Sequence, residues 1–266
     1  MKYHLHMIDL APTNPYASPL RSPILVAAGC AVRDVNLARV GAIVTRPTTV
    51  HTRGLPPPTW SAVPSGVVYS HLPSVSVRVL LRDEARRWSR SPAPVWVHLL
   101  GTAHDIDEML VRLAPVDDIA GFVVESEDAD IVRVLATARR GTLLPLWAML
   151  PLRPDLADLA QAATAAGSDA LVIAQPPPAA AWQGQTLVQG RLWGPAVIPQ
   201  VVAALAMLAP LVTVPLIAQG GVGDAPTARQ YLAVGATAVL VDAARWGDPL
   251  APNRVVEDGS LNGSVK

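Results

Sequence analysis

The chain has 266 residues, of which 51% are hydrophobic and only 16% charged, and 21 basic residues balance 21 acidic ones. This composition is typical of buried parallel strands, and the lack of a basic excess argues against nucleic acid as a partner. Lysine occurs only as Lys2 and Lys266. A Schiff-base mechanism in the folded body is therefore excluded.

The lone Cys30 permits no intramolecular disulfide, and no cysteine zinc site or other metal site is predicted. The first residues lack the apolar core of a signal peptide. Residues 198–219 carry no charge, but Pro199, Pro210 and Pro215 divide them into pieces too short to cross a bilayer. We therefore expect a cytoplasmic protein with no membrane span.

Apolar, strand-like runs alternate with helical patterns along the chain. The expected strands are residues 24–29, 42–45, 94–101, 119–124, 144–150, 169–174, 215–218 and 238–241. The expected helices are residues 75–90, 105–113, 128–140, 154–166, 199–208 and 225–234, and the Pro-rich residues 54–73 suggest a long loop. Eight strands alternating with helices predict an α/β fold, the (β/α)₈ TIM barrel.

The end of the chain is less regular. Only one helical turn, near residues 254–257, is visible after residue 249, so the eighth helix is predicted to be short or missing. We accordingly divide the chain into an N-terminal extension (1–20), the barrel (21–249) and a polar C-terminal tail (250–266). Either the N-terminal segment or a second subunit of a homo-oligomer would cover the exposed sheet, or the tail would hang loose.

The seventh strand runs into a turn at Gly220 and Gly221, and a helix begins a few residues later. The unpaired N–H groups and the dipole of a helix start favour a phosphate there. The loops after strands seven and eight are the usual phosphate site of TIM barrels. The turn therefore predicts a phosphorylated small-molecule ligand or cofactor, although glycines also simply let a chain bend.

Several side chains near strand ends have two interpretations each. His98 could contact a ligand as an acid or base, or it could be a buried structural histidine. Glu125 and Glu127 could line the mouth of the barrel or form a solvated acidic loop. Arg46 could bind an anion or form a structural ion pair. Cys30 is best explained as a small buried filler.

Six segments occur in an order and spacing that resemble the dihydroorotate dehydrogenase barrel, a flavin-binding enzyme family. They are Ser22-Pro-Ile-Leu-Val-Ala-Ala-Gly, Gly41-Ala-Ile-Val-Thr-Arg-Pro-Thr-Thr, Val95-Trp-Val-His-Leu-Leu-Gly, Gly190-Arg-Leu-Trp-Gly-Pro-Ala, Gly220-Gly-Val and Asp242-Ala-Ala. Gly54-Leu-Pro-Pro-Pro also resembles a loop of that family.

The resemblance implies FMN as the cofactor and assigns residues to it. Ala28 and Gly29 would lie along the isoalloxazine edge and Arg46 near the ring. Gly194 would lie near the ribityl chain, and Gly220, Gly221 and Ala243 at the phosphate. Arg46, Tyr69, His98 and Glu125 would form the substrate pocket.

The chain also departs from the family pattern. Arg46 and Ala148 stand where the family has lysines, and no asparagine lies between Asn36 and Asn253 to form its pyrimidine clamp. Asp242 replaces a glycine and brings a negative charge to the expected phosphate turn. Orotate is therefore not the expected substrate, because lost hydrogen-bond partners cost selectivity factors of ~10⁴ or more.

Three functions remain open at this point. The first is an FMN-linked oxidoreductase in which hydride moves to or from the flavin while Arg46 and His98 position the substrate. The second is a catalytically inactive homologue that binds a flavin, nucleotide or phosphate, or serves as a subunit. The third is a phosphate-binding barrel enzyme without flavin, such as an isomerase or aldolase.

Overall fold

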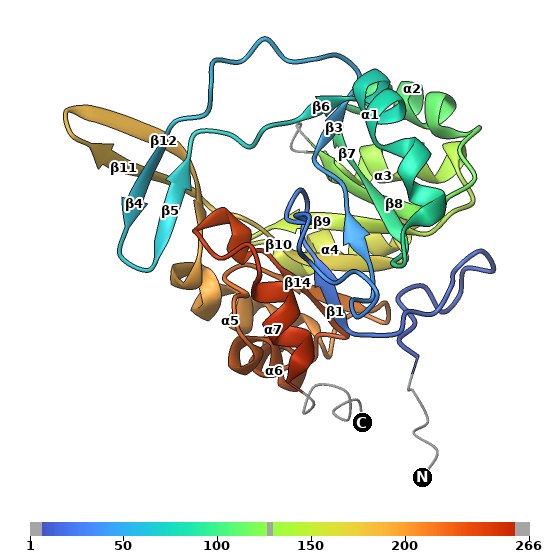
Figure 1. Ribbon diagram of the computed structural model, residues 1–266. Coiled ribbons are helices and arrows are strands. Elements are labelled where there is room, and N and C mark those ends of the chain that lie inside the picture. The colour runs from blue at the N-terminus through green and yellow to red at the C-terminus, as the bar shows by residue number, and fades with distance from the viewer. Residues whose placement is uncertain (1–6, 127–129, 259–266) are drawn as a thin grey trace.

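A computed structural model describes residues 7–126 and 130–258 (Figure 1). Its main sheet closes into a ring because β2 pairs in parallel with both β1 and β7. The ring consists of β1 (Ile24–Val26), β2 (Ile43–Val44), β7 (Val95–Gly101), β8 (Ile119–Ser126), β9 (Leu146–Pro151), β10 (Ala170–Gln175), β13 (Leu216–Gln219) and β14 (Ala238–Val241). The predicted eight-stranded parallel barrel is confirmed.

Helices follow most of these strands and form the outer layer. They are α1 (Val77–Asp83), α2 (Ala103–Leu113), α3 (Ile131–Gly141), α4 (Leu156–Ala165), α5 (Ile198–Leu208), α6 (Ala225–Ala233) and α7 (Ala251–Glu257), with 3₁₀ turns η1 (Ala85–Arg90), η2 (Pro195–Val197) and η3 (Ala243–Arg245). The predicted short eighth helix is α7. In the described chain, the connection that has no helix is the one from β1 to β2.

The lower part of the barrel interior is filled by two stacked indoles. Trp96 of β7 and Trp147 of β9 have ring centroids 3.4 Å apart and planes inclined by 18°. Strand β8 lies between β7 and β9, and a Cβ added to its Gly121 would be 2.3 Å from Cζ3 of Trp96. Because side chains alternate along a strand, the next inward positions, including His98, face the carboxyl-terminal mouth.

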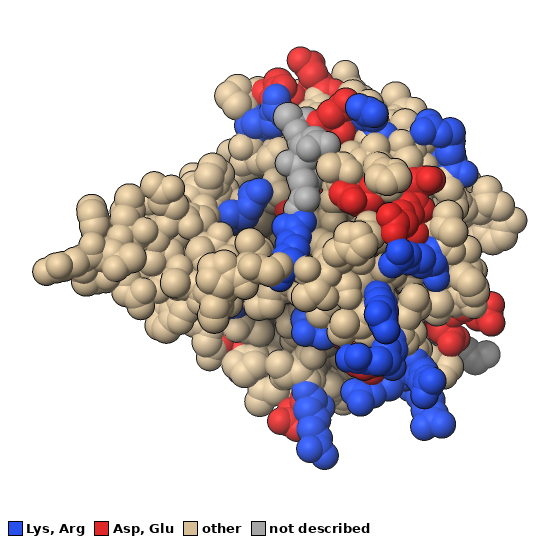
Figure 2. All heavy atoms as spheres, turned by 90° about the horizontal axis from the view of Figure 1, so that it is seen from above, with Lys and Arg blue, Asp and Glu red and all other residues tan. Residues whose placement is uncertain are grey.

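A second, four-stranded antiparallel sheet projects from the barrel (Figure 1). It consists of β4 (Trp60–Val63), β5 (Gly66–Tyr69), β11 (Pro178–Gln183) and β12 (Thr186–Trp193). Two further short strands extend the main sheet: β3 (Thr48–Thr49) pairs with β7, and β6 (Val75–Ser76) pairs with β3. The prediction of a long loop over residues 54–73 was therefore wrong, because these residues contain the β4–β5 hairpin. Figure 2 shows that the projection carries almost no charged side chains.

Segments from both ends of the described chain pack on the barrel. Ile8 and Leu20 bridge each other and are buried in the main core. Ala251 and Val255 of α7 are fully buried, and α7 contacts β1. The same chain thus covers the sheet next to β1, for which the sequence left the N-terminal segment, a second subunit or a loose tail as alternatives. No helix in the described part of the chain is long and apolar enough to span a membrane.

Candidate functional site at the mouth of the barrel

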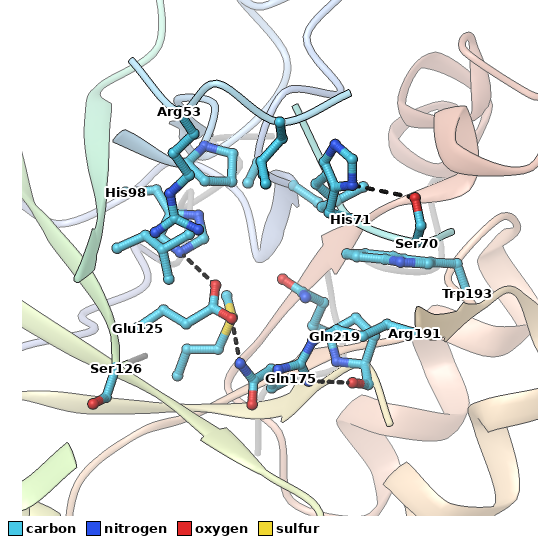
Figure 3. A pocket seen from close by; sticks show the side chains of 18 residues that line it. Arg53, Ser70, His71, His98, Glu125, Ser126, Gln175, Arg191, Trp193 and Gln219 are labelled. Carbon is cyan, nitrogen blue, oxygen red and sulfur yellow. Dashed lines mark hydrogen bonds and ion pairs between the residues drawn. The ribbon is translucent and has the colours of Figure 1, made fainter. Parts of the chain in front are cut away.

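A cavity of about 280 Å³ opens at the carboxyl ends of the barrel strands (Figure 3). This volume is near the lower end of the range for small-molecule sites, about 300–1,000 Å³. The lining residues come from the barrel and from the projecting sheet: Ala27, Ala28, Pro47, Arg53, Leu55, Ser70, His71, Leu72, His98, Leu100, Glu125, Ser126, Met149, Gln175, Pro176, Arg191, Trp193 and Gln219.

Three polar side chains, from β7, β8 and β10, meet on one wall of this cavity (Figure 3). Nε2 of His98 lies 3.0 Å from Oε2 of Glu125, and the side chains are only 3% and 14% exposed. The amide of Gln175 donates to the other oxygen of Glu125. The sequence placed His98 on the third strand and Glu125 at the end of the fourth, and the structure brings them into contact.

The Glu125 carboxylate is held in its charged form. Burial alone would raise the pKa of Glu125, but the hydrogen bond and charge of His98, the hydrogen bond from Gln175 and the charge of Arg191 together lower it. Nδ1 of His98 has no hydrogen-bond partner among the described residues. The wall therefore offers a buried acceptor and an imidazole nitrogen, arranged to hold a polar ligand edge or a proton.

Two glutamines of this site were not found from the sequence. Gln175 and Gln219 end β10 and β13, and both follow an apolar run that closes with Ala-Gln. Oε1 of Gln219 is buried without a hydrogen-bond partner among the described residues. A polar side chain at the carboxyl end of an apolar barrel strand was the signal that could have revealed them.

Arginines and an indole form the outer wall. Arg53 extends beside His98 in Figure 3, and Nη1 of Arg191 donates to the carbonyl of Pro176 at 2.8 Å. Trp193 lines the cavity, and the guanidinium of Arg245 lies 5.5 Å from the centre of its ring. The cavity thus combines an aromatic face with cationic groups, which suits a planar ligand that carries electronegative atoms.

Other predicted site residues lie at or outside the edge of the cavity. Arg46 is exposed and pairs with Glu84 at 2.5 Å, and it is not a lining residue. The hydroxyl of Tyr69 donates to the carbonyl of Arg245 at 2.8 Å, so the ring sits beside the wall rather than in it. Ala28 lines the cavity. Glu127 lies outside the described residues.

Gly29 and Gly194 adopt positive φ angles of 67° and 112°. Gly29 packs against Arg46: a Cβ added there would lie 2.8 Å from Cγ of Arg46. Gly194 precedes η2 and contacts the turn that follows β13, because its carbonyl lies close to Gly221. Neither glycine lines the cavity, although both flank elements that do.

The predicted phosphate turn is occupied by a side chain of the protein itself. Oδ1 of Asp242 accepts a hydrogen bond from the N–H of Val222 at 2.9 Å, and Oδ2 accepts one from Gly221 at 3.3 Å. Asp242 is fully buried, as is the next residue, Ala243. The main-chain donors that were predicted to bind a phosphate therefore bind a carboxylate.

Burial raises the pKa of Asp242 to about 7, although the hydrogen bonds from Val222, Gly221 and its own backbone and the charge of Arg245 act in the opposite direction. Beside it, the hydroxyl of Tyr231 donates to the carbonyl of Gly220 at 2.6 Å, and burial raises the pKa of this phenol. Hydrogen bonds from the turn to Asp242 and from Tyr231 to the turn thus fix its position in the core.

The fold is that of a TIM-barrel protein with a cavity at the carboxyl ends of its strands. The chain is 32% identical to the dihydroorotate dehydrogenase B (NAD(+)) catalytic subunit of Desulforudis audaxviator, covering 90% of this chain and 88% of that protein. It is 27% identical to the subunit of the same name from Pelobacter propionicus, with the same coverage. The chain therefore belongs to the dihydroorotate dehydrogenase family of oxidoreductases.

Solved structures agree on the fold. The ligand-free dihydroorotate dehydrogenase of Eimeria tenella superimposes with a TM-score of 0.71 at 15% identity, covering 97% of this chain and 89% of that one. Its complex with ferulenol gives 0.70 at 16% identity, covering 94% and 85%. No protein-family model matches the chain.

Members of this family are flavoproteins that bind FMN. The cavity here offers room and polar partners for a ring, but the turn expected to hold the phosphate does not fit one. At ~4 Å and an effective dielectric of 20, a phosphate charge and Asp242 in its ionised form would repel each other by about 4 kcal/mol. The N–H groups that would offset this repulsion already bind Asp242.

Proposed function

We propose that the mouth of this barrel binds a small planar ring with imide-type N–H and C=O groups, that this ring is not orotate, and that the chain is a ligand-binding homologue without the family's turnover. The observation that carries the proposal is the His98–Glu125–Gln175 cluster on the cavity wall. It favours a ligand N–H that donates to Glu125, because a charged, buried acceptor forms strong hydrogen bonds.

The remaining lining supports the same ligand class. Oε1 of Gln219 is a second buried acceptor without a donor among the described residues. Trp193 offers an aromatic face, and aromatic pairs contribute roughly 0.5–1.5 kcal/mol beyond the burial of their surface. Arg53 and Arg191 bring positive charge to the carbonyl side of such a ring.

The chain lacks the groups expected for the family's chemistry. No lysine lies between Lys2 and Lys266, and Ala148 stands where the resemblance places the lysine of strand five. Arg46, the other replacement, forms a surface ion pair with Glu84 instead of lining the cavity. These positions favour ligand binding over oxidation of dihydroorotate.

The second candidate is an FMN-linked oxidoreductase that acts on a substrate other than orotate. It is favoured by the contact between His98 and Glu125 at adjacent strand ends, where catalytic residues of TIM barrels are found. In this case the imidazole would hold or accept a proton from the substrate, and Glu125 would orient it.

Flavin content and turnover distinguish the two candidates. Under the first proposal, the purified protein carries no stoichiometric FMN and forms no orotate from dihydroorotate. It binds riboflavin, whose ring carries the imide edge, with quenching of tryptophan fluorescence, because Trp193 lines the cavity. A protein that retains stoichiometric FMN and reduces it with a dihydropyrimidine other than dihydroorotate would contradict the first proposal and support the second.

Glu125→Gln tests the role of the cluster. Removing the charge should weaken riboflavin binding at least tenfold, because the buried acceptor loses its strongest hydrogen bond. Glu108→Gln is the matched control, since Glu108 pairs with Arg112 on the surface of α2, away from the cavity. Equal effects of the two substitutions on the dissociation constant would refute the assignment of Glu125.

A further inference from the structure

The turn after β13 already contains a carboxyl group supplied by the chain. We infer that the Asp242 carboxylate is a built-in substitute for a ligand phosphate, so that the site selects the unphosphorylated form of its ring ligand, riboflavin over FMN. The choice of a flavin ring rests on the proposed function. The exclusion of phosphate does not, because it depends on the turn alone.

The turn has the geometry of an anion-binding site, and the Asp242 carboxylate occupies it. Both carboxylate oxygens of Asp242 accept main-chain N–H groups from successive residues, Gly221 and Val222. Gly220 and Gly221 have φ angles of 125° and 74°, which turn these N–H groups toward one point. A carboxylate in that position satisfies the donors that a phosphate would otherwise need.

The surroundings leave no room for both anions. A Cβ added to Gly221 would lie 2.7 Å from Cγ1 of Ile198 and 2.9 Å from the carbonyl oxygen of Gly194, so the turn is packed against the start of α5. The narrow void between Trp193, Gln219 and Asp242 has no room for a water molecule. A phosphate could reach the turn only by displacing the carboxylate.

Displacement of the carboxylate is also unfavourable electrostatically. The guanidinium of Arg245 donates to the carbonyl of Ala28 and lies over the ring of Trp193. Its positive charge acts on Asp242 but does not offset the effect of burial on that carboxyl group. A phosphorylated ligand would bring a second negative charge to a fully buried carboxylate.

The test compares riboflavin and FMN, titrated by fluorescence, on the full chain and on Asp242→Gly. We expect the unmodified chain to bind riboflavin at least tenfold more tightly than FMN. Asp242→Gly frees the two N–H groups and removes the charge, so the preference should fall at least tenfold. Asp242→Ala also removes the charge and both acceptor oxygens, and it provides the same comparison if the glycine variant does not fold.

Asp224→Asn is the matched control. Asp224 caps α6 by accepting from the N–H of Thr227 at 2.8 Å, and asparagine caps helices equally well. The preference of the Asp224→Asn variant for riboflavin over FMN should equal that of the unmodified chain. Equal affinity of the unmodified chain for riboflavin and FMN, or a preference that does not change in either Asp242 variant, would overturn the inference.

Failure of the proposed function would give a different result. If the unmodified chain binds neither flavin while Asp242→Gly binds FMN, phosphate exclusion stands and the ring-binding proposal fails. If no variant binds a flavin, inorganic phosphate is the probe. A rise in the melting temperature of Asp242→Gly with phosphate, absent in the unmodified chain, supports the inference, and no rise refutes it.

Discussion

Asp242 is a fully buried carboxyl group, and burial disfavours its charged form. Two main-chain hydrogen bonds offset part of this cost, since hydrogen bonds to a charged group contribute roughly 1.5–3 kcal/mol each. The raised pKa shows that they do not offset all of it. The residue should therefore make the stability of the protein depend on pH.

The expected direction follows from proton linkage. The pKa of Asp242 is about 7 in the folded protein against an ordinary value of 3.8, so the folded state holds a proton that the unfolded chain has released. Its contribution to stability is fully present below about pH 4 and is lost as the pH rises to 7. The difference in unfolding free energy between the unmodified chain and Asp242→Asn should fall by about 4 kcal/mol over this interval.

Denaturant unfolding at several pH values measures this difference, with Asp242→Asn as the non-titrating reference. Burial raises the pKa of Cys30 to about 12 and raises that of Tyr231, so neither neighbour titrates between pH 4 and 7. Arg245 is the remaining charged group that acts on Asp242. A difference that stays constant, or that grows with pH, would contradict the buried, protonatable carboxylate.

Single residues were only partly predictable from sequence. Asp242 was identified as a charge at the phosphate turn, but whether it points away from the turn or into it depends on packing between β13 and β14. His98 was identified because it alternates with Trp96 and Leu100 along an apolar strand, and Glu125 because it follows the end of the next one. Their contact depends on the register of β7 and β8, which pairs Leu100 with Glu125. No local pattern fixes that register.

At the level of elements, the barrel strands were predictable because they are long apolar runs between glycine, proline and polar segments. The projecting sheet was not. Its strands are short and lie among prolines, as in Pro56-Pro-Pro and Pro176-Pro-Pro, which favour loops. Its stability comes from a small cluster of Val68, Ala181 and Val188 that forms only when two distant hairpins meet.

One element of the barrel depends on the absence of a side chain. Gly121→Ala in β8 would place a Cβ 2.3 Å from Cζ3 of Trp96 and 2.7 Å from the carbonyl oxygen of Pro145. Trp96 cannot move freely, because it is stacked on Trp147. We expect a loss of roughly 1–3 kcal/mol in unfolding free energy, the usual cost of overpacking.

Gly54→Ala is the matched control for this substitution. A Cβ at Gly54 would have no neighbour within 4 Å. Both variants can be compared by denaturant unfolding, and the stacked indoles give an independent signal in near-ultraviolet circular dichroism. If Gly121→Ala leaves both the midpoint and that signal unchanged, the stacked pair is not packed as described.

For the whole molecule, the barrel needs cover beside β1, because the connection from β1 to β2 has no helix in the described chain. The described part of the predicted tail provides this cover, because α7 contacts both β1 and α6. Ala251 and Val255 are fully buried, and Asn253 receives the N–H of Asn36 at 2.8 Å. These contacts tie the last helix to the first crossover.

Val255→Ala tests whether this closure supports the entire barrel. It removes two buried methyl groups and leaves a cavity, so we expect a loss of about 2 kcal/mol in a single cooperative transition. Val111→Ala makes the same chemical change on α2 at a side chain that is 70% exposed, and it should have almost no effect. A loss confined to a separate early transition would mean that α7 unfolds independently, and the barrel would then have to be stable without it.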